Sequence, residues 1–241
     1  TQNKCAHLNL YSGDKHNVKQ ICYNPDSIWF AGDEVKNSVR YYGEICNREY
    51  SPDFINNLIK EANEKNFIVC LNHPYWSLQE PSELCEYKGL FALEIYNTDN
   101  VYWGWPEYDI YAYDIMSRHN IRLSPQMADD NHNPITEDNR FCGTFGGFNM
   151  IKAKDLSYES IFNALKNQEF YCSQGPKILD LYIEDGVAHI TCSNVKDIIM
   201  ATGIRHIKRY FAKDGEYMTS ACFNVEDRFK YIRFDVIDEN G

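Results

Sequence analysis

The sequence predicts an α/β fold, a parallel sheet or barrel of alternating strands and helices, followed by a small antiparallel β-domain. Up to about residue 176, apolar runs of strand length alternate with amphipathic runs at helical spacing. After Gln174-Gly175-Pro176, short apolar runs follow one another with only turn residues between them. We therefore place one domain at residues 1–176 and a second, sandwich-like domain at residues 177–241.

The first elements follow from local patterns. Residues 5–11 form a short strand-like run that contains His7, and a polar, irregular stretch continues to about residue 40. Ser51-Pro52 predicts a helix start, with Ser as N-cap and Pro at the first helical position. Apolar residues then recur at helical spacing, which predicts one buried helix face: Phe54, Ile55, Leu58, Ile59 and Ala62. The runs 67–71 and 91–96 read as buried strands.

The remaining elements continue the alternation. An amphipathic helix is expected between Glu107 and His119, and a strand then leads towards Asp130. Residues 144–153 predict a further strand and residues 157–167 a helix. In the C-terminal domain, strands are expected at residues 178–183, 187–192, 198–202, 217–223 and 231–236.

Composition narrows the range of functions. The 241 residues are 44% hydrophobic and 24% charged, as in ordinary globular proteins. A net charge of −11 argues against nucleic acid and anionic membranes as partners, because both attract Lys and Arg. No run of 18 apolar residues predicts a membrane-spanning helix. The nine cysteines lack CxxC spacing, and several lie in apolar runs (Cys70, Cys172, Cys192), which favours reduced thiols and a cytoplasmic location.

Metal-capable side chains follow two of the expected strands. His73 comes directly after the run 67–71, and Asp130 and His132 follow the run that begins at Arg122. The carboxyl ends of parallel strands meet at one edge of a sheet or barrel, so these groups are expected to converge. Imidazole and carboxylate together suit Zn²⁺, Mn²⁺ or Fe²⁺. The alternative for each motif is an ordinary turn or hydrogen-bonded loop residue.

Four motifs, in this order, carry a family resemblance. They are Asn72-His73-Pro74-Tyr75-Trp76, Glu94-Ile95-Tyr96-Asn97, Ala128-Asp129-Asp130-Asn131-His132 and Phe170-Tyr171 with Ser173 and Gly175-Pro176. The chain from about His7 onward thereby resembles the PHP (polymerase and histidinol phosphatase) superfamily of metal-dependent phosphoesterases, and most of all its branch with a C-terminal β-domain. The resemblance implies a distorted (β/α)7 barrel whose mouth holds two or three divalent ions.

The resemblance also implies roles for single residues. His7, His73, Asp130 and His132 look like metal ligands, and Asp129 like a supporting or turn residue. The implied reaction is hydrolysis of a small phosphorylated metabolite or nucleotide by metal-activated water, with no protein side chain named as catalytic. Arg140 is the candidate phosphate contact, its alternative being a solvated loop residue.

Other polar and aromatic residues near these motifs remain open. Glu94 and Asn97 sit at a strand end near the expected mouth of the barrel, and we interpret them as ordinary loop polar groups in preference to site residues. A set of aromatic residues either lines a substrate cleft or packs at the rim: Tyr75, Trp76, Tyr102, Trp103 and Trp105.

The chain departs from the family pattern before His7. The family's His-x-His strand, its Thr-Asp-His-like motif and its metal-bridging Glu are all missing. We therefore expect a partial barrel belonging to a piece of a longer protein, with fewer metal ions or none. Two alternatives stay open: a non-catalytic binding module of the same fold, and a metal hydrolase of amidohydrolase type.

Overall fold

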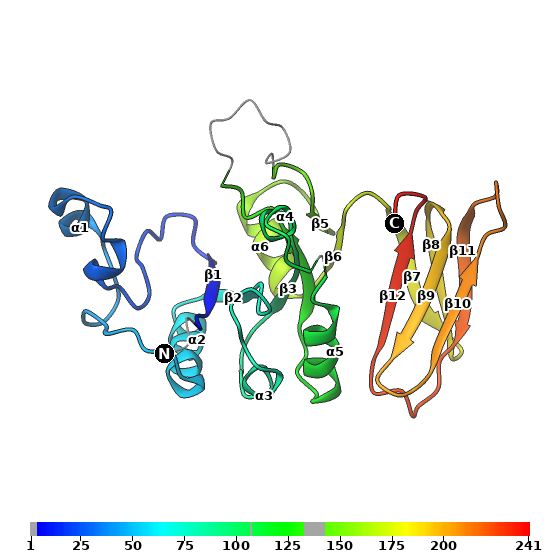
Figure 1. The fold of residues 1–241 in the computed structure, drawn as a ribbon, viewed down its shortest axis with the longest axis horizontal. Helices are drawn as coiled ribbons and strands as arrows, with labels where there is room; N and C mark the ends of the chain where they lie inside the picture. The colour runs from blue at the N-terminus through cyan, green and yellow to red at the C-terminus, as the bar shows by residue number, and fades with distance from the viewer. Residues whose placement is uncertain (1–3, 107, 133–142) are drawn as a thin grey trace.

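A four-stranded sheet lies at the centre of the N-terminal part of the protein (Figure 1). The computed structural model describes residues 4–106, 108–132 and 143–241. The strand order is β1-β2-β3-β4, with β2, β3 and β4 parallel and β1 antiparallel to β2. The strands are β1 His7–Ser12, β2 Phe67–Asn72, β3 Ala92–Asn97 and β4 Ser124–Ala128.

The direction of β1 differs from the parallel arrangement that the sequence predicted. Ser12, at the end of β1, pairs with Phe67, at the start of β2, and the Gly13 amide donates to Asn66 O at 2.7 Å. The long connection through residues 13–66 thus returns the chain to the end of the sheet where it left. Within the described residues the sheet is open, so the expected distorted (β/α)7 barrel is reduced here to a four-stranded mixed sheet.

Helix α2 (Pro52–Glu64) begins where the sequence predicted. Ser51 has extended backbone, and its Oγ accepts a hydrogen bond from the Phe54 amide at 3.2 Å. Ile55 and Ile59 are buried and pack in one core with Val69 of β2. The N-cap prediction is confirmed, and this helix covers one face of the sheet.

Replacing Ser51 by Ala is expected to lower the free energy of unfolding by about 1 kcal/mol, because the first turn of α2 loses its side-chain acceptor. Urea unfolding followed by circular dichroism measures the change. Ser51→Asp supplies the control, since it keeps an acceptor and should stay close to the unmodified protein. Equal stability of all three proteins would mean that Ser51 does not cap the helix.

The other helices are short. Asp109 caps α5 by accepting from the Ala112 amide at 3.3 Å, so this helix starts later than predicted, and Glu107 lies outside the described residues. The short helical elements are η1 Pro25–Ile28, α1 Asp33–Ser38, α3 Pro81–Leu84, α4 Thr98–Tyr102, α5 Ile110–Arg118 and α6 Tyr158–Lys166. The first four of these, each four to six residues long, were not predicted.

A two-stranded antiparallel sheet follows β4 in the chain. It pairs β5 (Phe148–Ile151) with β6 (Phe170–Ser173), and a helix lies between these strands in the sequence. The strand expected over 144–153 is limited to its middle. The Asn149 side chain donates to Met127 O at 2.9 Å and accepts from the Met127 amide at 3.1 Å. The Asn149 side chain therefore makes the two hydrogen bonds that a neighbouring strand would make with Met127, and it holds β5 beside β4.

Two antiparallel three-stranded sheets form the C-terminal β-domain, as the sequence predicted. Their strand orders are β11-β8-β7 and β10-β9-β12, and residues from both sheets share one core that includes Ile190, Ile198 and Met200. Strand β10 was missed because all of its residues are exposed. The bounds are β7 Ile178–Glu184, β8 Val187–Val195, β9 Asp197–Thr202, β10 Ile207–Phe211, β11 Met218–Asn224 and β12 Ile232–Ile237.

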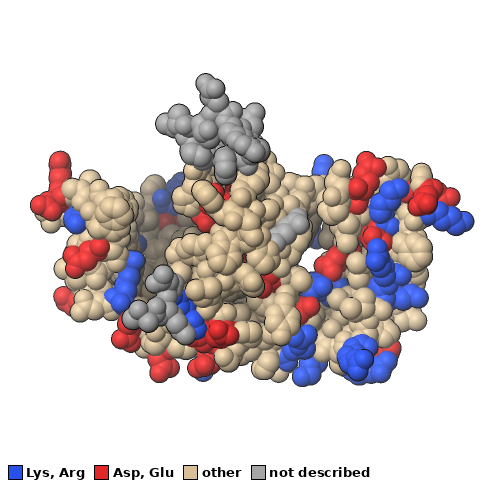
Figure 2. All heavy atoms as spheres, viewed as in Figure 1, with Lys and Arg blue, Asp and Glu red and all other residues tan. Residues whose placement is uncertain are grey.

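Polar contacts join the two parts. Arg233 of β12 forms an ion pair with Asp114 of α5 and a second with Asp235 at 3.0 Å. On the face drawn in Figure 2, Lys and Arg are interspersed with Asp and Glu over the β-domain. Within the described ranges no helix has the length and hydropathy to cross a membrane. The eight cysteines that the structure describes are all free thiols.

Candidate metal centre

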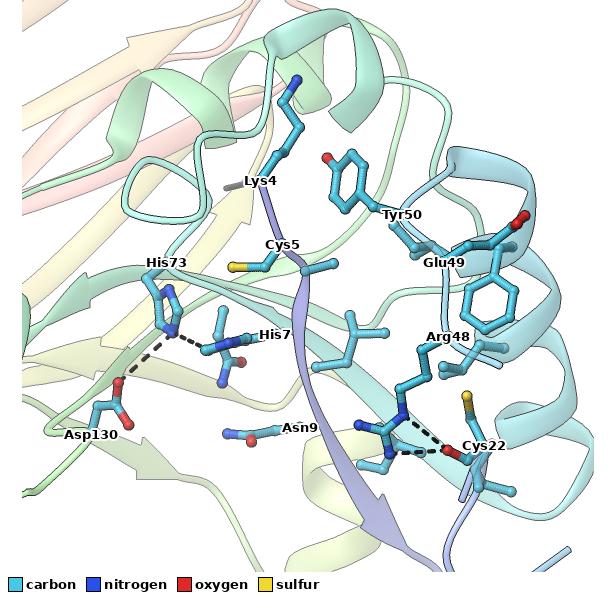
Figure 3. A pocket seen from close by; sticks show the side chains of 18 residues that line it. Lys4, Cys5, His7, Asn9, Cys22, Arg48, Glu49, Tyr50, His73 and Asp130 are labelled. Atoms are coloured by element: carbon cyan, nitrogen blue, oxygen red, sulfur yellow. Dashed lines mark hydrogen bonds and ion pairs between the residues drawn. The ribbon is translucent and has the colours of Figure 1, made fainter. Parts of the chain in front are cut away.

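The reversed direction of β1 brings His7 to the edge where the parallel strands end. His7 pairs in register with Asn72, the last residue of β2, and His73 follows at once. Asp130 comes two residues after the end of β4. The side chains of His7, His73 and Asp130 thus come from three segments and point towards one another (Figure 3).

The distances within this group are short. Nδ1 of His7 lies 3.2 Å from Nε2 of His73, and the same Nε2 lies 3.8 Å from Oδ2 of Asp130. The Trp76 ring packs against both imidazoles, with centroid distances of 5.3 Å to His7 and 5.1 Å to His73. Two imidazoles and one carboxylate are therefore held at the same place, beside an aromatic wall.

His73 is fixed in orientation and kept uncharged. Its Nδ1 lies 3.2 Å from Ser77 Oγ, which leaves Nε2 to face His7 and Asp130. Burial, with the neighbouring His7 as a smaller cause, lowers the pKa of His73 to about 4. The backbone of His73 and of Asp130 is left-handed, with φ of 26° and 49°. Such strain in residues other than glycine often accompanies functional sites.

Asn97 of β3 links Asp130 to the buried Glu94. Asn97 Nδ2 donates to Asp130 Oδ2 at 3.1 Å and to Glu94 Oε1 at 2.9 Å. Glu94 is only 1% exposed, and burial raises its pKa to about 7, against the opposing effect of the Asn97 hydrogen bond. The interpretation of Glu94 and Asn97 as ordinary loop residues was wrong, because both lie in β3 and are buried.

The raised pKa of Glu94 predicts a pH-dependent stability in the metal-free protein. The folded state binds this proton more tightly than the unfolded chain, so the contribution is full below about pH 4.5 and is lost as the pH rises through about 7. The loss amounts to at most about 3 kcal/mol, from 1.36 kcal/mol per pKa unit. Glu94→Gln should remove this pH-dependent contribution. The free energy of unfolding of the variant minus that of the unmodified protein should therefore be larger at pH 8 than at pH 5.

Urea unfolding at both pH values, with a chelator present, measures this difference. His73 titrates with the opposite sign in both proteins, because its lowered pKa stabilises the fold above about pH 6.5. The contribution of His73 is the same in the unmodified protein and in Glu94→Gln, so it cancels to first order in the difference between them. A difference that does not change with pH would contradict the assignment of the raised pKa to Glu94.

His132 stands apart from the two other imidazoles. Its Nδ1 lies 2.6 Å from the backbone oxygen of Asp130 and 3.5 Å from Oδ2 of Asp99. It lies 3.9 Å from Oδ1 of Asp130, and its side chain is 70% exposed. Asp130 therefore stands between His73 and His132, and the structure does not bring all four predicted ligands around one point.

Asp129 anchors the following loop. Its carboxylate accepts from the amides of Phe145, Gly146 and Gly147 at 2.7, 2.9 and 3.0 Å, and from Thr98 Oγ1 at 2.8 Å. A Cβ on Gly146 would approach Thr98 Oγ1 to 2.3 Å, so this close approach requires glycine. The bonds engage both carboxylate oxygens, and Asp130 is the aspartate that faces His73.

Asn72 is a residue of this centre that the sequence analysis did not select. It is 8% exposed, and its Oδ1 has no hydrogen-bond partner among the described residues. Together with His7, His73 and Asp130, Asn72 lines a cavity of about 570 Å³ along β1. The sequence shows an Asn directly before the His-Pro pair. Only the pairing of β1 with β2 shows that this Asn lies opposite His7.

Several predicted features lie outside this group. Arg140 is not among the described residues. Trp76 contacts the imidazoles, Tyr75 packs edge-on against Trp105 with centroids 6.0 Å apart, and the rings of the predicted aromatic set are all at least 36% exposed. Within the described residues, no group of three or more His, Cys, Asp or Glu side chains is arranged so that it could hold a metal ion as it stands.

Comparison with known proteins gives little independent information. No family model matches the chain, and no curated protein matches it. Among solved structures, it is similar to a two-domain protein from Bacteroides vulgatus that contains a predicted PHP-like metal-dependent phosphoesterase, with 16% identity and a TM-score of 0.37. The match covers 78% of this chain and 57% of that one, so the chain spans little more than half of that protein.

Proposed function

We propose that the protein binds a divalent metal ion through His7, His73 and Asp130 and is a metal-dependent hydrolase of the PHP type. The observation that carries the proposal is the convergence of these side chains from three separate segments, with 3.2 Å between the two imidazole nitrogens. Two nitrogens bound to one tetrahedral ion at 2.0–2.1 Å would lie about 3.3 Å apart. The two imidazole nitrogens are therefore spaced as ligands of a shared ion would be.

The surroundings prepare these side chains for a metal. His73 is neutral at ordinary pH. Its contact with Ser77 orients the ring, and metal-binding imidazoles in proteins usually have a hydrogen-bonding partner of this kind. Asn97 holds Asp130 in the same way. The candidate ions remain Zn²⁺, Mn²⁺ and Fe²⁺, which accept this mixture of nitrogen and oxygen donors.

The proposed reaction is hydrolysis of a small phosphorylated metabolite or nucleotide. A bound ion would supply hydroxide near neutral pH and balance charge on the phosphoryl oxygens. His132 and Asp99 offer an exposed imidazole and a carboxylate on the far side of Asp130, where a second ion could share that carboxylate. With a net charge of −11, we expect neither nucleic acid nor an anionic membrane as partner.

A binding module without catalysis is the second candidate, and one specific observation favours it. Among the described strands β1 has a neighbour, β2, on one side only, and the cavity follows β1 from Lys4 to Leu10. In Figure 3, His7 and Asp130 lie on one side of this strand and Arg48 on the other. An open edge beside a cavity of this size could hold a ligand or a chain segment instead of a reacting phosphate.

Metal analysis and turnover together separate these functions. The purified chain is treated with chelator, incubated with Mn²⁺ or Zn²⁺, freed of excess ion and analysed for bound metal. We expect about one ion per chain and slow hydrolysis of p-nitrophenyl phosphate, because a two-ion phosphoesterase needs more ligands than this group provides. No retained metal would overturn the proposal. Metal-dependent cleavage of amides or lactones instead of phosphate esters would indicate the amidohydrolase type.

A further inference from the structure

The carbonyl oxygen of the Asn72 side chain is a buried acceptor without a partner. Asn72 is 92% buried, and no described group donates to its Oδ1. A buried amide that makes no hydrogen bond costs the fold about 1–3 kcal/mol. Gln79 Oε1 is the other such atom among the described residues, but Gln79 does not line the cavity.

The register of the sheet places Asn72 beside the metal-capable side chains. Asn72 and His7 are direct partners in the β1–β2 ladder, so their side chains leave the same face of the sheet with Cβ atoms about 4.5–5.5 Å apart. His73 is the next residue along the chain, and all three line the same cavity with Asp130. The residue that carries the unpartnered oxygen therefore belongs to the wall of the proposed centre.

We infer that Asn72 Oδ1 is a fourth donor to the cation that His7, His73 and Asp130 bind. This inference rests on the proposed function and adds a ligand that distinguishes between metals. The donor set becomes two nitrogens and two oxygens. An amide oxygen is a hard donor, which suits Mn²⁺ better than it suits Zn²⁺. Binding of the ion supplies the partner that the oxygen lacks.

The test replaces the amide by an apolar side chain of similar size. In the metal-free protein, Asn72→Leu should leave the midpoint of urea unfolding unchanged or raise it, because an unsatisfied buried group is removed. Isothermal titration with Mn²⁺ should show at least about tenfold weaker binding, because even residues that only support a metal ligand contribute 10–100-fold. Zn²⁺ affinity should fall less. Asn57→Leu, the same substitution at an exposed asparagine of α2, is the matched control and should bind both ions normally.

The outcomes separate this inference from the function on which it rests. Normal Mn²⁺ affinity in a folded Asn72→Leu protein, together with loss of binding in His73→Ala, would overturn the role of Asn72 and leave the metal centre in place. An equal loss for Mn²⁺ and Zn²⁺ would overturn the preference for a hard ion. Absence of binding by the unmodified chain would overturn the centre and the role of Asn72 together.

If Asn72→Leu is too unstable to measure, Asn72→Asp tests the same role of Asn72, and here the Mn²⁺ affinity is expected to rise instead of fall. A carboxylate keeps the oxygen and adds charge next to the cation, so Mn²⁺ should bind more tightly than to the unmodified protein. Unchanged or weaker Mn²⁺ binding by the Asp variant would overturn the inference.

Discussion

His73→Ala is expected to lower the affinity for Mn²⁺ or Zn²⁺ by at least about 100-fold, since even residues that only support a ligand contribute 10–100-fold. His73 is the central member of the group, because its Nε2 faces His7 at 3.2 Å and Asp130 at 3.8 Å. Without this imidazole the two remaining donors no longer share a neighbour. Isothermal titration of the chelator-treated protein measures the loss.

Two further variants make this result specific. Asp130→Asn keeps the shape of an exposed side chain and removes its charge, so it should weaken binding while leaving the unfolding midpoint nearly unchanged. His16→Ala removes an exposed imidazole outside the cavity and should bind metal normally. If His73→Ala retained full affinity in a folded protein, the centre would have to lie elsewhere.

Asp129→Ala is expected to lower the free energy of unfolding by about 3–5 kcal/mol. The Asp129 carboxylate accepts four hydrogen bonds, three of them from the successive amides of Phe145, Gly146 and Gly147. Each bond to a charged group is worth about 1.5–3 kcal/mol, and water recovers part of the sum at this partly exposed loop. Urea unfolding measures the loss. Thermal unfolding with metal present shows whether the variant loses metal binding together with the structure of this loop.

The comparison with Asp130 gives this prediction its meaning. The two aspartates are adjacent in the sequence, yet Asp129 binds backbone amides while Asp130 faces His73. Asp129→Ala should therefore act mainly on stability and Asp130→Asn mainly on metal affinity. The reverse pattern would mean that the motif is shifted by one residue and that Asp129 is the ligand.

Local pattern was sufficient to predict many elements of this protein. The N-cap at Ser51, the apolar face of α2 and the buried strand that ends before His73 all depend on residues within one or two turns of each other. The antiparallel C-terminal sheets also followed from short apolar runs separated by turn residues. The sequence likewise marked His73, Asp130 and His132 as metal-capable residues near strand ends, and the family resemblance added His7.

What the tertiary structure alone decided is how those residues meet. The direction of β1 depends on where a 54-residue excursion returns the chain, which no local pattern encodes, and that direction puts His7 opposite Asn72. Glu94 and Asn97 looked like loop residues because burial is a property of the assembled sheet. Asp129 and Asp130 have the same chemistry, and only the close approach of Gly146 and Gly147 gives them different partners. The local spacing of residues specifies helices and strands. Pairing between residues far apart in the sequence decides where the possible metal ligands of a site lie.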